Sequence, residues 1–115
     1  MDSAGLELGN HQHFKDLCNF KKTFVVLVYM DTCKPCQRLK PALLKRASHD
    51  NIPVYMIHKG TDPKLDSELE VQKVPHLVSF RDGEFRGHIQ NSDILVSWPF
   101  IKDSMMDLNL EDEDF

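Results

Sequence analysis

The chain has 115 residues, a length that suits one domain with a single core. Hydrophobic residues make up 41% of it and charged residues 28%, which excludes collagen-like, coiled-coil and disordered chains. The longest apolar run, residues 24–30, is too short to cross a bilayer, and the first residues lack the basic and then apolar pattern of a signal peptide. We therefore expect a globular, cytoplasmic protein that makes no contact with a membrane.

The net charge of −4 comes from 14 Lys and Arg residues against 18 Asp and Glu residues. Four of these acids lie together at 111–114, so the rest of the chain is formally neutral. A neutral body lacks the basic face that a phosphate-backbone binder needs, which argues against a nucleic-acid partner. We expect one domain over residues 1–108 and an acidic, disordered tail over 109–115.

The first half of the chain alternates between strand and helix patterns. Residues 6–8 suggest a short edge strand, and Asn10 is placed to cap a helix over about residues 11–20. Residues 23–29 are β-branched or apolar on both parities, which is the pattern of a central strand covered on both faces. After a short turn, apolar residues return at helical spacing, with Pro41 inside the predicted helix.

The second half continues the alternation. Three further strands are expected, over about residues 54–58, 77–80 and 85–89. A short helix over about 63–69 lies between the first two, and Asp82-Gly83 forms the centre of a hairpin turn between the others. Ser97 is placed to cap a last helix with Pro99 in its first turn. This order predicts an α/β fold with parallel crossovers and one antiparallel edge.

Two of the three cysteines form the motif Cys33-Lys34-Pro35-Cys36, directly after the central strand and at the start of a helix. Unpaired backbone N–H groups, the helix dipole and Lys34 all favour the thiolate of Cys33 there. Pro35 has no N–H to lose in the first turn. Cys36 lies one turn further in. The spacing predicts that Cys33 attacks a disulfide and that Cys36 resolves the mixed disulfide.

Two other interpretations of the pair stay open. A zinc site needs four ligands, yet the sequence has no second Cys-x-x-Cys and no His-x3-His. The second interpretation is that the pair is structural, namely two buried cysteines that only happen to lie close together. The third cysteine, Cys18, is expected to be a small core residue.

Four features occur in order along the chain: the cysteine motif, Pro41 five residues after Cys36, Val74-Pro75, and residues 80–84. With them the chain resembles the thioredoxin family from about residue 8 to residue 108. The resemblance implies a thioredoxin-like fold, with a central mixed sheet of four or five strands and helices on both faces.

The resemblance also implies a substrate-binding groove beside the cysteines. It implies a cis bond between Val74 and Pro75 and a Val74 backbone that pairs with an extended substrate segment. His76 follows directly, and Asn91 occupies the position where the family has a glycine beside the site. We count all four residues as expected substrate-binding positions.

The sequence departs from the family pattern around the motif. Thr32 stands where the family has tryptophan and Lys34 where it has glycine, so one apolar contact for partners is lost. The family's buried carboxylate falls on Leu27, and its companion lysine falls on about Met56. The proton of the second cysteine must therefore pass to water, to His76 or to the substrate.

The resemblance and the motif together imply a thiol–disulfide oxidoreductase that reduces or exchanges protein disulfides. Its redox group is the Cys33–Cys36 disulfide, and no cofactor or metal is expected. Its partners are then disulfide-bearing proteins and, as reductant, a thioredoxin reductase or glutathione. The alternative is a thioredoxin-fold interaction module with weak or vestigial redox activity, whose groove beside Val74-Pro75 binds a partner protein.

Overall fold

A computed structural model describes residues 5–90 and 94–105 of the chain; Asn91 and the acidic tail lie outside these ranges. The strands are β1 (Leu6–Glu7), β2 (Phe24–Tyr29), β3 (Val54–His58), β4 (His76–Arg81) and β5 (Glu84–Gln90). The helices are α1 (His11–Asn19), α2 (Lys34–His49), α3 (Pro63–Glu68) and α4 (Ile94–Met105). None of the helices in the described ranges is long and apolar enough to span a membrane.

The strands form one mixed sheet of five strands in the order β1-β3-β2-β4-β5, which confirms the expected architecture. β1, β3 and β2 run parallel, whereas β4 runs antiparallel to β2 and β5 antiparallel to β4. The prediction that every helix makes a parallel crossover is therefore wrong for the connection through α3.

The connection through α3 keeps the chain at one edge of the sheet. α3 is a six-residue helix that rises only about 9 Å, whereas the six-residue strand β4 extends about 20 Å, so the helix itself does not return the chain along the sheet. The chain instead enters β4 at the edge where β2 and β3 end, with His76 opposite Val28. This places the start of β4 beside the start of α2.

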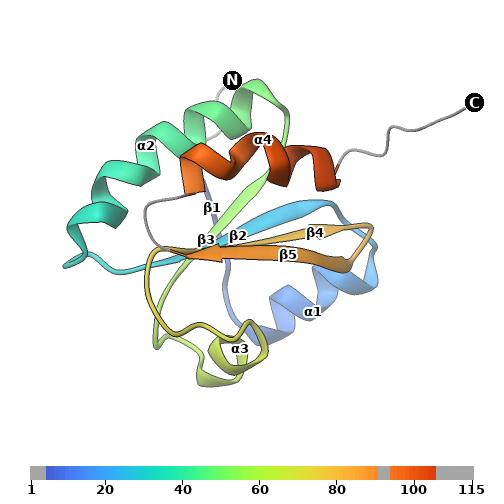
Figure 1. Cartoon of the computed structure of the whole chain (residues 1–115). Helices are drawn as coiled ribbons and strands as arrows, with labels where there is room; N and C mark the ends of the chain where they lie inside the picture. Colours follow the sequence, from blue (N-terminus) through green and yellow to red (C-terminus); the bar gives the residue numbers. More distant parts are fainter. Residues whose placement is uncertain (1–4, 91–93, 106–115) are drawn as a thin grey trace, which may run out of the picture.

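Helices cover both faces of the sheet: α2 and α4 lie on one face, and α1 and α3 on the other (Figure 1). β2 is buried at all six positions because its side chains alternate between the two layers. Val25 and Leu27 pack in the cluster beneath α2 and α4, and Val26 and Val28 in the cluster beneath α1 and α3. The uninterrupted apolar sequence of β2 is explained by the helices that cover both faces of the sheet.

The last helix begins earlier than the sequence suggested. α4 starts at Ile94, so Ser97 and Pro99 lie inside it and the prediction of a cap at Ser97 is wrong. The helix is positioned by packing: Ile94, Trp98, Ile101 and Met105 form its buried stripe. At its middle, the Trp98 Nε1–H donates to the Asp50 carboxylate at 2.7 Å, which connects α4 to the end of α2.

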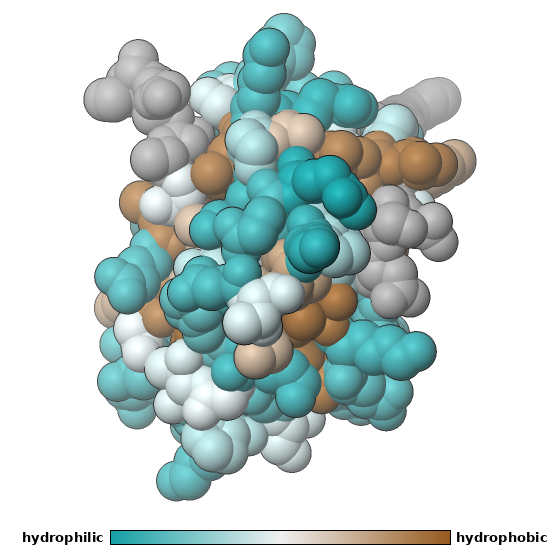
Figure 2. All heavy atoms as spheres, turned by 90° about the vertical axis from the view of Figure 1, so that its left-hand side faces the viewer, coloured by the Kyte–Doolittle hydropathy of each residue, from teal (hydrophilic) through white to brown (hydrophobic). Residues whose placement is uncertain are grey.

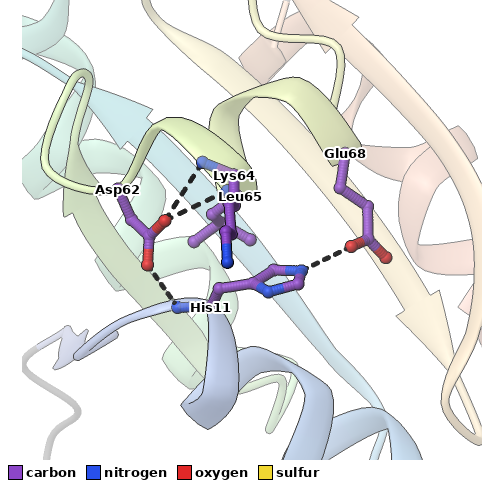
Figure 3. Close-up of polar contacts among 5 residues, drawn as sticks. All are labelled: His11, Asp62, Lys64, Leu65 and Glu68. Carbon is purple, nitrogen blue, oxygen red and sulfur yellow. Dashed lines mark hydrogen bonds and ion pairs between the residues drawn. The ribbon is translucent and has the colours of Figure 1, made fainter.

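One carboxylate connects the first turns of α1 and α3 (Figure 3). Asp62 caps α3 by accepting hydrogen bonds from the backbone N–H groups of Lys64 and Leu65, and its other oxygen accepts the N–H of His11 at 2.8 Å. These N–H donors lower the pKa of Asp62, and the backbone N–H of His11 has the largest effect. The His11 ring lies 2.6 Å from a Glu68 carboxylate oxygen, so α1 and α3 are held at two points.

Candidate active site

Cys33 is the N-cap residue of α2, directly before Lys34. It has extended backbone angles, and its sulfur accepts a hydrogen bond from the backbone N–H of Cys36 at 3.2 Å. The turn before it is closed by the Cys33 N–H, which donates to the Met30 carbonyl oxygen. The Cys33 sulfur therefore lies at the positive end of a 16-residue helix dipole, where a thiolate is favoured over a thiol.

Cys36 is bonded to Cys33 as a disulfide, across a Cα–Cα distance of 5.2 Å. Its side chain is fully buried in the cluster beneath α2 and α4, whereas Cys33 is only half-buried at the surface. An incoming sulfur atom can thus reach Cys33 but not Cys36. The cysteine predicted to attack is thus the more exposed of the two, and both roles stay predictions.

Val74 lies against the cysteine pair. The Cys33 sulfur is 3.9 Å from the Val74 carbonyl oxygen, and the Val74-Pro75 bond is cis. Val74 is half-buried, and it packs against the apolar clusters of both faces. The structure therefore brings together two of the features on which the resemblance depended, although they are 41 residues apart in the chain.

The remaining residues of the motif are exposed. Thr32, Lys34 and Pro35 surround Cys33 at the surface, with Lys34 and Pro35 in the first turn of α2. Asn91, the fourth expected substrate-binding position, lies outside the described residues. Among the described residues, the surface that a substrate can contact around Cys33 is thus formed by Thr32, Lys34 and Pro35 together with Val74.

His76 follows Pro75 but turns its ring away from the cysteines. Its neighbour Leu77 packs in the cluster that contains Cys36, so strand alternation directs His76 to the opposite face of the sheet. There its ring lies 5.4 Å from that of His88. This position does not suit His76 for taking the Cys36 proton.

The His76 ring is fully buried, and neither of its nitrogens has a hydrogen-bond partner among the residues described. Burial lowers the pKa of His76, and the charge of His88 lowers it further. Two smaller effects raise the pKa of His76: the Leu69 backbone, which is near the ring but makes no hydrogen bond to it, and the charge of Glu70. The ring is therefore held in its neutral form.

Leu27 lies in the cluster that also contains Cys36, with no exposed surface. It is paired in the sheet with Met56 on β3 and with Leu77 on β4. The two departures identified in the sequence are thus neighbours in space, and apolar side chains occupy both positions.

A polar cluster beside the motif was not expected from the sequence. His58 at the end of β3 lies 3.1 Å from the Asp31 carboxylate, and its ring lies 4.4 Å from that of Tyr29. On the other side, the Lys40 ammonium is 4.3 Å from the centre of the Tyr29 ring. Burial raises the pKa of Tyr29, and the charges of Asp31 and Glu7 raise it further.

The pairing of parallel strands could have revealed this cluster. Tyr29 and His58 are the last residues of β2 and β3, and they are opposite each other in register. Two strands predicted to be parallel bring their carboxyl ends to one edge of the sheet. The cation–π contact of Lys40 depends on the placement of α2 and has no comparable signal.

The zinc interpretation gains no support from the geometry. Within residues 5–90 and 94–105, no three His, Cys, Asp or Glu side chains are grouped so that they could hold a metal ion. The third cysteine, Cys18, is half-buried near Glu68, and burial raises its pKa. Its thiol is therefore held protonated, as expected of a structural residue.

The fold and the site define a thioredoxin-fold protein with a Cys-x-x-Cys disulfide at the start of its second helix. The family model described as Thioredoxin matches residues 6–97. The chain therefore belongs to the thioredoxin family.

Individual relatives are distant. Thioredoxin X of Arabidopsis thaliana chloroplasts is 26% identical over 80 residues, which are 68% of this chain and 44% of that protein. A thioredoxin-like protein of Synechocystis is 30% identical over 70 residues, which are 59% of this chain and 67% of that protein. The chain thus spans less than half the length of the Arabidopsis relative.

Solved structures agree in fold. Oxidised mitochondrial thioredoxin 3 of Saccharomyces cerevisiae superimposes with a TM-score of 0.78 at 25% identity, over 86% of this chain and 94% of that chain. A thioredoxin of Halobacterium salinarum gives a TM-score of 0.75, also at 25% identity, over 93% and 99% of the two chains.

Proposed function

We propose that this protein is a thiol–disulfide oxidoreductase that reduces or exchanges disulfides of other proteins. One observation supports this most strongly: the half-buried Cys33 sulfur lies at a helix N-terminus and next to the Val74 carbonyl, with the fully buried Cys36 bonded to it. A structural disulfide needs neither a helix dipole nor an accessible attacking atom.

In the first step, the thiolate of the reduced Cys33 attacks one sulfur of a substrate disulfide. A bond forms between Cys33 and that sulfur, and the other substrate sulfur leaves as a thiolate. The substrate is then bound to Cys33 as a mixed disulfide, and an extended segment of the substrate can pair with the Val74 backbone beside Cys33.

In the second step, Cys36 loses its proton and attacks the Cys33 sulfur. The Cys33–Cys36 disulfide forms, and the second substrate sulfur leaves as a thiolate. Two electrons pass from the protein to the substrate, and no further cofactor takes part. A thioredoxin reductase or glutathione then restores the dithiol, and we place the protein in the cytoplasm.

Cysteine replacement tests this order of events. Cys36→Ser is expected to accumulate mixed disulfides with substrate proteins, because the attack proceeds and the resolution does not. Cys33→Ser is expected to accumulate none, since Cys36 is buried. The measurement is recovery of the adducts on a non-reducing gel and their release by dithiothreitol. Equal trapping by the two variants would contradict the assignment of roles.

The second candidate function is a thioredoxin-fold interaction module with vestigial redox activity. The apolar pair Leu27 and Met56 favours it, because these side chains occupy, within the described part of the chain, the positions where the family has a carboxyl group and its companion lysine. Insulin reduction with a dithiol reductant separates the two candidates. The oxidoreductase accelerates precipitation of the insulin B chain above the rate of the reductant alone, whereas the interaction module does not.

A further inference from the structure

Two lysines flank the contact between the attacking sulfur and the substrate-pairing backbone. Lys34 directly follows Cys33 and Lys73 directly precedes Val74, and the Cys33 sulfur and the Val74 carbonyl oxygen are 3.9 Å apart. Both lysine side chains are exposed, and neither forms an ion pair with any residue of the described ranges. A substrate that reaches Cys33 therefore comes near two lysines that have no ion-pair partner among the described residues.

Two acidic residues lie near these lysines in the sequence, and neither forms an ion pair with them. Asp31, two residues before Cys33, lies 3.1 Å from His58. Glu70 lies three residues before Lys73 and is exposed. One turn further along α2, Arg38 is also exposed and has no ion-pair partner among the described residues.

The surface around the motif offers little apolar area as an alternative source of specificity. Figure 2 shows the side of the molecule on which α2 begins; hydrophilic residues cover much of it, and hydrophobic residues are exposed between them and at the upper right edge. Thr32 moreover provides no large apolar contact next to Cys33. The charge of the lysines is thus one feature by which this surface can distinguish substrates.

We infer that the preferred substrates are protein disulfides whose flanking residues are acidic. This inference rests on the proposed function and specifies its substrate class. Exposed charges act over about 8–10 Å at physiological ionic strength and mainly change the rate of encounter, so the preference is kinetic and sensitive to salt. The chemical steps are those given above and do not change.

Three matched peptides test the inference. Each carries one intramolecular disulfide, and the two residues on either side of the cysteines are Glu, Gln or Lys. We expect kcat/KM to be about tenfold higher for the Glu peptide than for the Lys peptide at low salt, with the Gln peptide between them. In 0.5 M NaCl the three values are expected to converge, because the charges are screened within a few ångströms.

Charge variants assign the preference to the two lysines. Lys34→Gln combined with Lys73→Gln is expected to reduce the ratio of kcat/KM between the Glu and Lys peptides to nearly one, and Lys34→Glu combined with Lys73→Glu is expected to invert it. Lys45→Gln is the matched control: Lys45 is also exposed, but it lies 11 residues further along α2, about 16 Å from Lys34. It should leave the ratio unchanged.

The ratio between peptides separates recognition from reactivity. Lys34 also favours the Cys33 thiolate, so its replacement slows all three peptides together, and only a change in the ratio reports on substrate charge. Equal kcat/KM values for the three peptides at low salt would overturn the inference and leave the proposed function standing. Absence of turnover with any peptide would overturn the proposed function itself.

Discussion

Leu27 determines what Cys36 can do with its proton. A buried carboxyl group at this position would accept that proton as the mixed disulfide is resolved. Leucine only fills the core, with Met56 and Leu77 as its neighbours in the sheet. His76 points away from the pair, so under the proposed mechanism we expect the proton to pass to water or to the substrate.

Replacing Leu27 by aspartate should therefore speed the resolution step. Leu27→Asp is also expected to cost about 2–5 kcal/mol of the free energy of unfolding, because it buries an acid with no companion lysine and leaves space unfilled. The measurements are the decay of a preformed Cys33 mixed disulfide and a denaturant titration. Leu27→Asn is the control, since it also buries a polar group but cannot take up the proton. Equal acceleration by both variants would point to loosened packing rather than proton transfer.

His76 makes the stability of the protein depend on pH. The folded state holds the ring neutral below its ordinary pKa of about 6.5, whereas the unfolded chain binds a proton there. The free energy of unfolding is thus expected to fall as the pH drops from 6.5 toward the lowered pKa of the folded state. The slope contributed by one such group is at most about 1.4 kcal/mol per pH unit.

His76→Leu is expected to flatten this dependence, and urea titrations at pH 7, 6 and 5 would measure the effect. His88→Gln is the control, because His88 is exposed. The control should retain most of the slope. An unchanged slope in His76→Leu would show that other groups cause the acid sensitivity.

At the scale of elements, Asp62 is expected to stabilise α1 and α3 together, because its two oxygens accept N–H groups from both helices. Asp62→Ala should lower the Tm by about 4–8 °C, as is typical for loss of a helix cap in a domain of this size. Asp62→Asn, which keeps one acceptor oxygen, should lower it less.

The pH dependence of this effect has a defined sign. The pKa of Asp62 is lowered in the folded state, so its stabilisation is present above about pH 4 and is lost as the pH falls through the lowered value. The Tm difference between wild type and Asp62→Ala should shrink in that range. A difference that is the same at pH 7 and at pH 3 would contradict the role of the charged carboxylate.

Most elements could be predicted from the sequence because local signals and packing agree. Three such signals are the continuous apolar run of β2, the cap at Asp62 and the Asp82-Gly83 turn. Both residues of that turn have positive φ, as its sequence predicts. The start of α4 could not be predicted, since Ser97 is a good cap in isolation. Burial of Ile94 against the sheet overrides that preference.

The candidate site could be predicted in part. The motif places both cysteines at the start of α2 without any knowledge of the sheet. The direction of the His76 ring could not be predicted, because it depends on which face Leu77 occupies. The direction of β4 could not be predicted either, since the connection over residues 59–75 is long enough for a parallel or an antiparallel strand.

At the scale of the whole molecule, the sheet is most deeply buried at its central strand, β2. β2 is buried along its full length and paired on both sides, whereas β1 has two exposed residues and β5 is a largely exposed edge strand. Local opening requires less free energy where fewer buried contacts are lost.

Hydrogen exchange should follow this order. We expect the slowest amides in β2, at the rate of global unfolding, and exchange in β1 and β5 at least about 100-fold faster. Mass spectrometry of peptic fragments over a time course would measure this. Protection of β5 equal to that of β2 would show that the sheet opens only as one unit.

The turn between β4 and β5 has a consequence for protein engineering. Gly83 has a φ of 82°, its N–H donates to the Lys22 carbonyl oxygen at 2.9 Å, and a side chain there would collide with the Cys18 carbonyl. Hairpin tips are usually chosen for inserted epitopes or fused reporters because they project freely into solvent. This tip is instead seated on the end of α1, so an insertion between Asp82 and Gly83 would lift the hairpin away from the helix that covers it.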